Sequence, residues 1–121
     1  MIDPVVAWDK ISNFETAQEI REYFQSENIQ AVQREHNACA IAVWLKNTTG
    51  INNVSVAGFV HIGGYVDVTY MDDEGITRHH IQPKWSFKHT AATEKFLDEF
   101  DRGTYPELIE PGSKFYLNNE L

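Results

Sequence analysis

The chain has 121 residues, of which 42% are hydrophobic and 23% charged, and these ordinary values argue for one globular domain and against disorder. Its 18 Asp and Glu against 10 Lys and Arg give a net charge of −8, which disfavours direct binding to nucleic acid. A single cysteine cannot form an internal disulfide, and we find neither a basic leader nor a long apolar run, so we expect a cytoplasmic protein with no membrane contact.

The first predicted helix covers residues from about 13 to 25. The stretch SNFE at 12–15 matches a capping box, in which Ser12 caps the helix and Glu15 reaches back to it. Apolar residues then recur at steps of three and four, which indicates one buried stripe. The short run at 29–32 fits either a strand or a connector.

The second predicted helix spans about 38–49. We expect Asn37 to cap it, and Gly50 to end it in the left-handed conformation that favours glycine. Residues 38–45 are apolar on every side, which is typical of a buried element. A buried strand is the alternative for this run, but its alanine content favours a helix.

Alternating apolar and polar residues predict an antiparallel meander in the middle of the chain, with one face buried. Its expected strands are residues 54–56, 59–62, 65–71 and 76–81. We expect Gly63 and Gly64 to form a two-residue hairpin turn and residues 72–75 to form a second turn. Pro83 is expected to end the sheet.

A last helix is predicted at 89–103, capped by Thr90 and stopped by Gly103, and residues 114–119 are expected to add a closing strand. The whole chain, residues 1–121, should therefore form a single α+β domain. In this domain an antiparallel β-meander of three to five strands has about three helices packed against it.

Three segments between residues 37 and 117 together resemble a known group of proteins. They are NACAIAVWL at 37–45, KFLDEFDRGTYPELIEP at 95–111 and KFYL at 114–117. The set resembles small uncharacterised proteins of bacteriophages and their bacterial hosts, which carry a Cys-Pro-Ile-Ala-type helix start and a Phe-Ile-x-x-Phe-Asp-x-Gly segment. Here Cys39 is followed by Ala40 where proline is common, and Leu97 stands where isoleucine is common. The resemblance spans roughly 36–120 and implies a phage or mobile-element accessory protein, with no established activity and no functional residue.

Cys39 is the first candidate for chemistry. If Asn37 caps the helix, the thiol lies among the free amides of a helix start, which lower a thiol pKa. A histidine on a neighbouring strand could then act as a base, and the candidates are His61, His79 and His80. That arrangement would make a cysteine-dependent hydrolase. Cysteine is also among the most often buried residues, so we favour an unreactive core residue.

The segment 75–93 is the second candidate, because it contains no Asp or Glu in an otherwise acidic protein. It combines cations with aromatic rings and ends at a predicted helix start, where free amides suit an anion. The expected ligand is a small nucleotide-like anion, and the candidate residues are Arg78, His80, Lys84, Trp85, Lys88, His89 and Thr90. The alternatives are an ordinary strand with a basic outer face and a self-association surface.

Acidic residues of the last predicted helix form the third candidate. They are Glu94, Asp98, Glu99 and Asp101. Such a face is often merely solvated, and its functional interpretation is docking on a basic protein partner.

The sequence predicts no metal site and no cofactor. Asp72, Asp73 and Glu74 lack the ligand spacing of an EF-hand loop. The neighbours His79 and His80 would point to opposite faces of a strand, so they cannot chelate one metal together.

We therefore expect a non-enzymatic binding protein, associated with a phage or mobile element, that inhibits a host protein such as a defence effector. It would dock its acidic face on a basic effector, or it would sequester a nucleotide in the segment 75–93. The alternatives are the cysteine-dependent hydrolase and a structural module. The module would self-associate as a homo-oligomer through strand edges or through Trp85 and Phe87.

Overall fold

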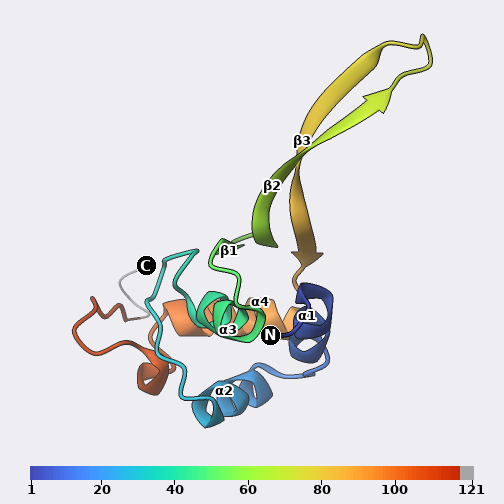
Figure 1. Cartoon of the computed structure of the whole chain (residues 1–121). Coiled ribbons are helices and arrows are strands. Elements are labelled where there is room, and N and C mark those ends of the chain that lie inside the picture. The colour runs from blue at the N-terminus through green and yellow to red at the C-terminus, as the bar shows by residue number, and fades with distance from the viewer. Residues whose placement is uncertain (118–121) are drawn as a thin grey trace.

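The computed structural model describes residues 1–117, and its α+β architecture confirms the predicted fold class (Figure 1). Within this range the chain forms four α-helices, one short 3-10 helix and a three-stranded antiparallel sheet of order β1-β2-β3. The helices are α1 (Pro4–Ser12), α2 (Ala17–Ser26), α3 (Ala40–Thr49), α4 (Ala91–Asp101) and the 3-10 helix η1 (Pro106–Leu108). The strands are β1 (Val54–Val56), β2 (Phe59–Met71) and β3 (Thr77–Lys88). Over the same residues, every helix is too short or too polar to cross a lipid bilayer.

The centre of the core lies where α2, α3 and α4 meet. One aromatic side chain from each helix is buried there: Phe24 from α2, Trp44 from α3 and Phe96 from α4. The rings of Phe24 and Phe96 meet edge to face with centroids 5.3 Å apart, and the rings of Phe24 and Trp44 stack at 6.1 Å. Aromatic contacts of this kind add to the stabilisation from burial alone, so they hold the three helices together.

The capping box of α2 lies at Thr16 and Glu19, and the prediction of Ser12 and Glu15 is wrong. The Thr16 hydroxyl accepts a bond from the Glu19 amide (3.2 Å), and the Glu19 carboxylate accepts one from the Thr16 amide (3.0 Å). Ser12 is instead the last residue of α1, where its hydroxyl donates to the Asp9 carbonyl (3.1 Å). Both segments have the same pattern of a hydroxyl residue followed three places later by glutamate.

No helix was expected where α1 forms. Asp3 caps it by accepting a backbone amide (2.8 Å), and Pro4 occupies the first turn, where a missing N–H costs nothing. Trp8 is buried and stacks on Phe87 of β3, with ring centroids 5.8 Å apart. This contact joins α1 to the foot of the sheet.

Gly63 and Gly64 do not form the predicted hairpin turn, because β2 continues through both of them. The register changes between Ile62 and Tyr65, so two residues of β2 face one residue of β3. This irregularity is a β-bulge, and it increases the local twist of the strand pair. The two glycines have φ values of 83° and 73°, which suit a tight hairpin turn as well as a bulge.

Pro83 was predicted to end the sheet, but this prediction is wrong, because Pro83 lies inside β3. β3 pairs with β2 alone, so its outer edge has no neighbouring strand that would need an amide donor. The predicted turn at 72–75 is confirmed, and the Gly75 amide donates there to the Asp72 carbonyl (3.0 Å). The outcome is one long hairpin of β2 and β3 with a single turn.

The outer part of this hairpin, residues 65–83, projects from the helices as a two-stranded ribbon (Figure 1). We call these residues the arm. The expected burial of one sheet face holds only at its foot, where Val60 and Ile62 are buried. On the arm, Val66 is half-buried and Tyr70 is exposed. The helices cover only the foot, and both faces of the arm are accessible to solvent.

The sequence analysis left two alternatives for residues 29–32, a strand or a connector. In the structure this segment is a connector. It forms one isolated parallel bridge, between Ala31 and Ile109. The Ala31 amide donates to the Leu108 carbonyl (2.8 Å), which ties the connector to the end of η1.

The predicted closing strand at 114–119 does not form over residues 114–117, and residues 118–119 lie outside the described part of the chain. Gln33 holds this segment to the body. Its side chain donates to the Tyr116 carbonyl (2.8 Å) and accepts from the Tyr116 amide (2.7 Å).

Gly63→Ala should lower the free energy of unfolding by roughly 1–3 kcal/mol. A Cβ at this position would lie 2.9 Å from the Trp85 ring, and its φ of 83° is unfavourable for an L-residue. Gly58→Ala is the matched control, because a Cβ there meets no atom within 4 Å. Urea denaturation measures both variants, and an equal loss in the two would contradict the bulge assignment.

Candidate functional site

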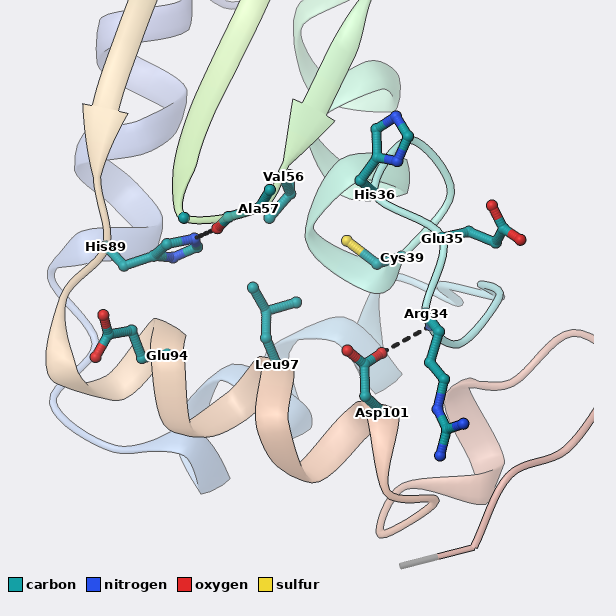
Figure 2. Close-up of a pocket in the computed structure, with 11 residues that line it drawn as sticks. Arg34, Glu35, His36, Cys39, Val56, Ala57, His89, Glu94, Leu97 and Asp101 are labelled. Atoms are coloured by element: carbon teal, nitrogen blue, oxygen red, sulfur yellow. Dashed lines mark hydrogen bonds between the residues drawn. The ribbon is translucent and has the colours of Figure 1, made fainter. Parts of the chain in front are cut away.

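A groove of about 460 Å³ opens on the helical body between the loop 34–39, the β1–β2 turn and α4 (Figure 2). Its walls combine three carboxylates, two imidazoles, one thiol and a small apolar surface. The lining includes Arg34, Glu35, His36, Cys39, Val56, His89, Glu94, Leu97 and Asp101. Several distant parts of the sequence therefore meet at this one place.

Backbone bonds hold the loop 34–39 in position. Arg34 has a φ of 61°, and its amide donates to Oδ1 of Asp101 on α4 (2.9 Å). The His36 carbonyl accepts from the Val56 amide of β1 (2.7 Å). The loop is thus fastened to a helix and to a strand, so the groove is formed before any ligand arrives.

Asp101 is half-buried at the rim of the groove. Burial raises the pKa of its carboxyl above the usual value, and the bond from the Arg34 amide acts in the opposite direction. A carboxylate that is partly removed from water attracts a cation more strongly than one on an open surface. Asp101 is therefore suited to bind a positive group.

Cys39 is the N-cap of α3, and the expectation of Asn37 as the cap is wrong. The Cys39 amide donates to the Glu35 carbonyl (2.8 Å), and its side chain makes no capping bond. The side chain is only 4% exposed, and burial raises the pKa of the thiol to about 11. At neutral pH the sulfur is therefore a neutral thiol, which is a poor nucleophile.

The two imidazoles of the groove are not placed as bases for this thiol. His89 uses both ring nitrogens: Nε2 donates to the Ala57 carbonyl (2.7 Å), and Nδ1 lies 3.0 Å from Oγ1 of Thr93. His36 is exposed, and in Figure 2 its ring points away from the sulfur of Cys39. These positions favour a packing role for the thiol.

The structure does not bring the expected bases to the groove either. His61 lies on β2 with the Tyr65 hydroxyl 3.4 Å from its Nδ1, and it does not line the groove. His79 and His80 lie on the arm. Across residues 1–117 we find no group of three or more His, Cys, Asp or Glu side chains placed to hold one metal ion.

The outer candidates of the basic segment lie on the arm. Arg78 bonds Asp72 through its Nε (2.6 Å to Oδ2), and Nε2 of His80 lies 2.9 Å from Oε1 of Gln82. Lys88 is exposed at the far end of the same strand. The extended strand separates Arg78 from Lys88 by about 33 Å, so these cations do not converge on one ligand.

The inner candidates lie at the foot of the arm and at the start of α4. Nζ of Lys84 lies 4.7 Å above the ring of Trp85. His89 lines the groove, as described above. Thr90 caps α4 as predicted, and its hydroxyl accepts from the Thr93 amide (3.1 Å). The segment therefore supplies one residue to the groove, and its other members lie elsewhere.

Two of the four acidic candidates line the groove. Glu94 and Asp101 lie seven residues apart on α4, with Leu97 between them on the same side of the helix. Glu35, from the loop, supplies a third carboxylate that the sequence analysis missed. It lies in an irregular segment, where no periodicity or motif marks a residue.

The other two acidic candidates have neighbours of their own. Asp98 forms an ion pair with Arg102 (3.1 Å). Tyr105 is buried, and its pKa is raised by this burial and by the hydrogen bond with Glu99. The acidic side chains of α4 thus divide between the groove and contacts within the protein.

Comparisons with protein-family models, with curated proteins and with solved structures find no match to this chain. The resemblance to phage accessory proteins stays a prediction. Any inference about function therefore rests on the geometry and charge of the groove and the arm.

The Cys39 thiol should react at least about 100-fold more slowly with a maleimide or disulfide reagent in the folded protein than in urea, because two pKa units separate it from an ordinary thiol. Labelling at neutral pH, followed by mass spectrometry, measures both rates. Fast labelling of the folded protein would contradict the packing role and favour the hydrolase.

Proposed function

We propose that this protein is a non-enzymatic binding protein that holds a cationic segment of a protein partner in the groove beside α4. The observation that carries this proposal is the composition of the groove. Three carboxylates, Glu35, Glu94 and Asp101, surround it. Its one arginine, Arg34, lies with Cζ 3.8 Å from the ring centroid of Tyr116, and its positive charge lowers the pKa of the Asp101 carboxyl, so the groove keeps an excess of two carboxylates. In Figure 2 the Arg34 side chain accordingly points out of the groove.

A lysine or arginine side chain fits these walls chemically. Its aliphatic stem would pack on Leu97 and Val56, while its charged end would meet Glu94 and Asp101. The net charge of −8 would speed the approach of a basic partner. The sequence analysis expected the whole acidic face of α4 to bind a basic partner. We now assign this binding to Glu94 and Asp101, the two acidic residues of α4 that line the groove.

The setting of this activity comes from the resemblance to phage accessory proteins. In that setting the partner is a host protein with a basic surface, such as a defence effector. Occupation of that surface would block whatever acidic ligand it normally binds, so the protein would act as an inhibitor by competition.

The nucleotide alternative has less support. A bound nucleotide would need several cations within reach of its phosphates, whereas the candidate cations are spread along the length of β3. The groove itself adds three carboxylates, which repel phosphate.

A lysine-rich peptide should bind the protein, and Glu94→Gln and Asp101→Asn should each weaken its affinity by about 2–5-fold, as expected for partly exposed ion pairs. Fluorescence anisotropy with a labelled peptide measures the affinity, which should fall with added salt. Acidification should also weaken binding, and the loss should begin above the usual range of an Asp pKa, because burial raises the pKa of Asp101.

Asp9→Asn is the matched control for this experiment. It removes one negative charge from α1, on another part of the surface. It should leave the peptide affinity unchanged. The same loss in all three variants would show a response to net charge alone and would contradict the groove as the binding site.

A further inference from the structure

Residues 113–117 run past the end of α4 beside the groove loop, and we call this segment the strap. Gln33 is its main anchor, because the side-chain amide pairs with both the amide and the carbonyl of Tyr116 (2.7 and 2.8 Å). The nitrogen of the same side chain lies 3.1 Å from the Asp101 carbonyl at the end of α4. One buried side chain therefore ties the strap to the helix and to the loop that walls the groove.

Gly103 lets the strap approach the end of α4 closely. Its φ is 83°, and a Cβ at this position would overlap the carbonyl oxygen of Tyr116. The rest of the strap is weakly held, since Lys114 is exposed and Phe115 and Leu117 are 43% and 48% exposed. A segment with so few buried contacts opens at a lower free energy than the core does. Detachment of the strap therefore leaves the helices packed.

Tyr116 determines where the charge of Arg34 lies. The ring centroid of Tyr116 is 3.8 Å from Cζ of Arg34 and 4.9 Å from Nζ of Lys114. In Figure 2 the Arg34 side chain points away from the groove, although its backbone amide bonds the Asp101 carboxylate (2.9 Å). The position of this cation thus depends on a ring that the strap carries.

We propose that the strap regulates the groove: when it detaches, Arg34 loses the Tyr116 ring and turns into the groove as a cation of the chain's own. Two carboxylates lie within its reach. Glu35 is its neighbour in the chain, and Asp101 already accepts its amide. The attached strap keeps the groove open to a cationic partner, and the detached strap closes it. This inference rests on the proposed function, because it concerns the same groove.

The two positions of Arg34 are close in free energy. A cation–aromatic contact and an ion pair are similar in strength when they are partly exposed, so the strap decides between the two positions. Linkage makes the effect reciprocal. A cationic ligand that displaces Arg34 from the carboxylates favours the attached strap, and binding of a partner is thereby coupled to attachment.

The pKa of Asp101 reports the position of Arg34 without any ligand. Tyr116→Ala should lower this pKa by about 0.5, because the guanidinium moves towards the carboxylate. Tyr116→Phe keeps the ring and should leave the pKa unchanged. NMR titration of the side-chain carboxyl measures each variant, and near-ultraviolet circular dichroism confirms that the variants fold.

Arg34→Gln separates this effect from a merely structural one. In that background Tyr116→Ala should not change the pKa of Asp101, because no guanidinium is left to move. A loss of packing alone would change the pKa equally with and without Arg34. An equal change in the two backgrounds, or no change in either, overturns the proposal.

Peptide binding tests the consequence for the groove. Tyr116→Ala should weaken the affinity for the lysine-rich peptide by about 2–5-fold, and this loss should vanish in the Arg34→Gln background. Fluorescence anisotropy measures both, and a loss that persists without Arg34 overturns the proposal. If the wild-type protein binds no such peptide, the groove function is wrong, whereas the titration of Asp101 still decides whether the strap controls Arg34.

Gly103→Ala detaches the strap by a second route, because its Cβ displaces the Tyr116 carbonyl. Gly75→Ala is the matched control, since its φ of 79° is equally unfavourable but a Cβ there meets no atom within 4 Å. Hydrogen exchange at the Tyr116 amide should become at least tenfold faster in Gly103→Ala alone. A lowered pKa of Asp101 in that variant supports the proposal, and faster exchange with an unchanged pKa overturns it.

Discussion

The packing of Phe96 on Phe24 decides where α4 lies, and most of the molecule depends on the position of that helix. β3 leads into α4 through two residues, so the helix also fixes the foot of the arm. The side of α4 that turns away from the aromatic core carries Glu94, Leu97 and Asp101 into the groove. A single helix thus joins the core, the groove and the arm, and a shift of its axis would disturb all three.

Asp101 shows how a structural contact and a binding group can share one side chain. One of its oxygens accepts the Arg34 amide and so fastens the loop that forms the opposite wall of the groove. An ionised carboxylate offers about four acceptor positions, so this bond leaves others for a cation. The thiol of Cys39 has no such capacity, because burial keeps it neutral. The chemistry of the groove is therefore that of charge recognition.

Sequence patterns predicted the structure correctly where a residue type has a single structural use, such as ending or capping a helix. Gly50 ends α3 with a φ of 73°, and Thr90 caps α4, both as the sequence predicts. The predictions from sequence were wrong where one pattern fits two structures. Consecutive glycines serve a hairpin turn or a bulge, and only the pairing of distant strands decides between them. The groove was beyond prediction for a related reason: Glu35 and Asp101 are far apart in the chain, and tertiary packing alone brings them together.

Pro83 has a consequence for how copies of the chain can associate in large numbers. An exposed β-strand edge is a template on which further strands can add without limit, and this is how amyloid fibrils grow. On the outer edge of β3 the proline offers no amide to such a strand, and the bulge opposite it twists the ribbon out of plane. Growth by edge addition is thereby obstructed. A chain with a long exposed hairpin can in this way remain a molecule of defined size.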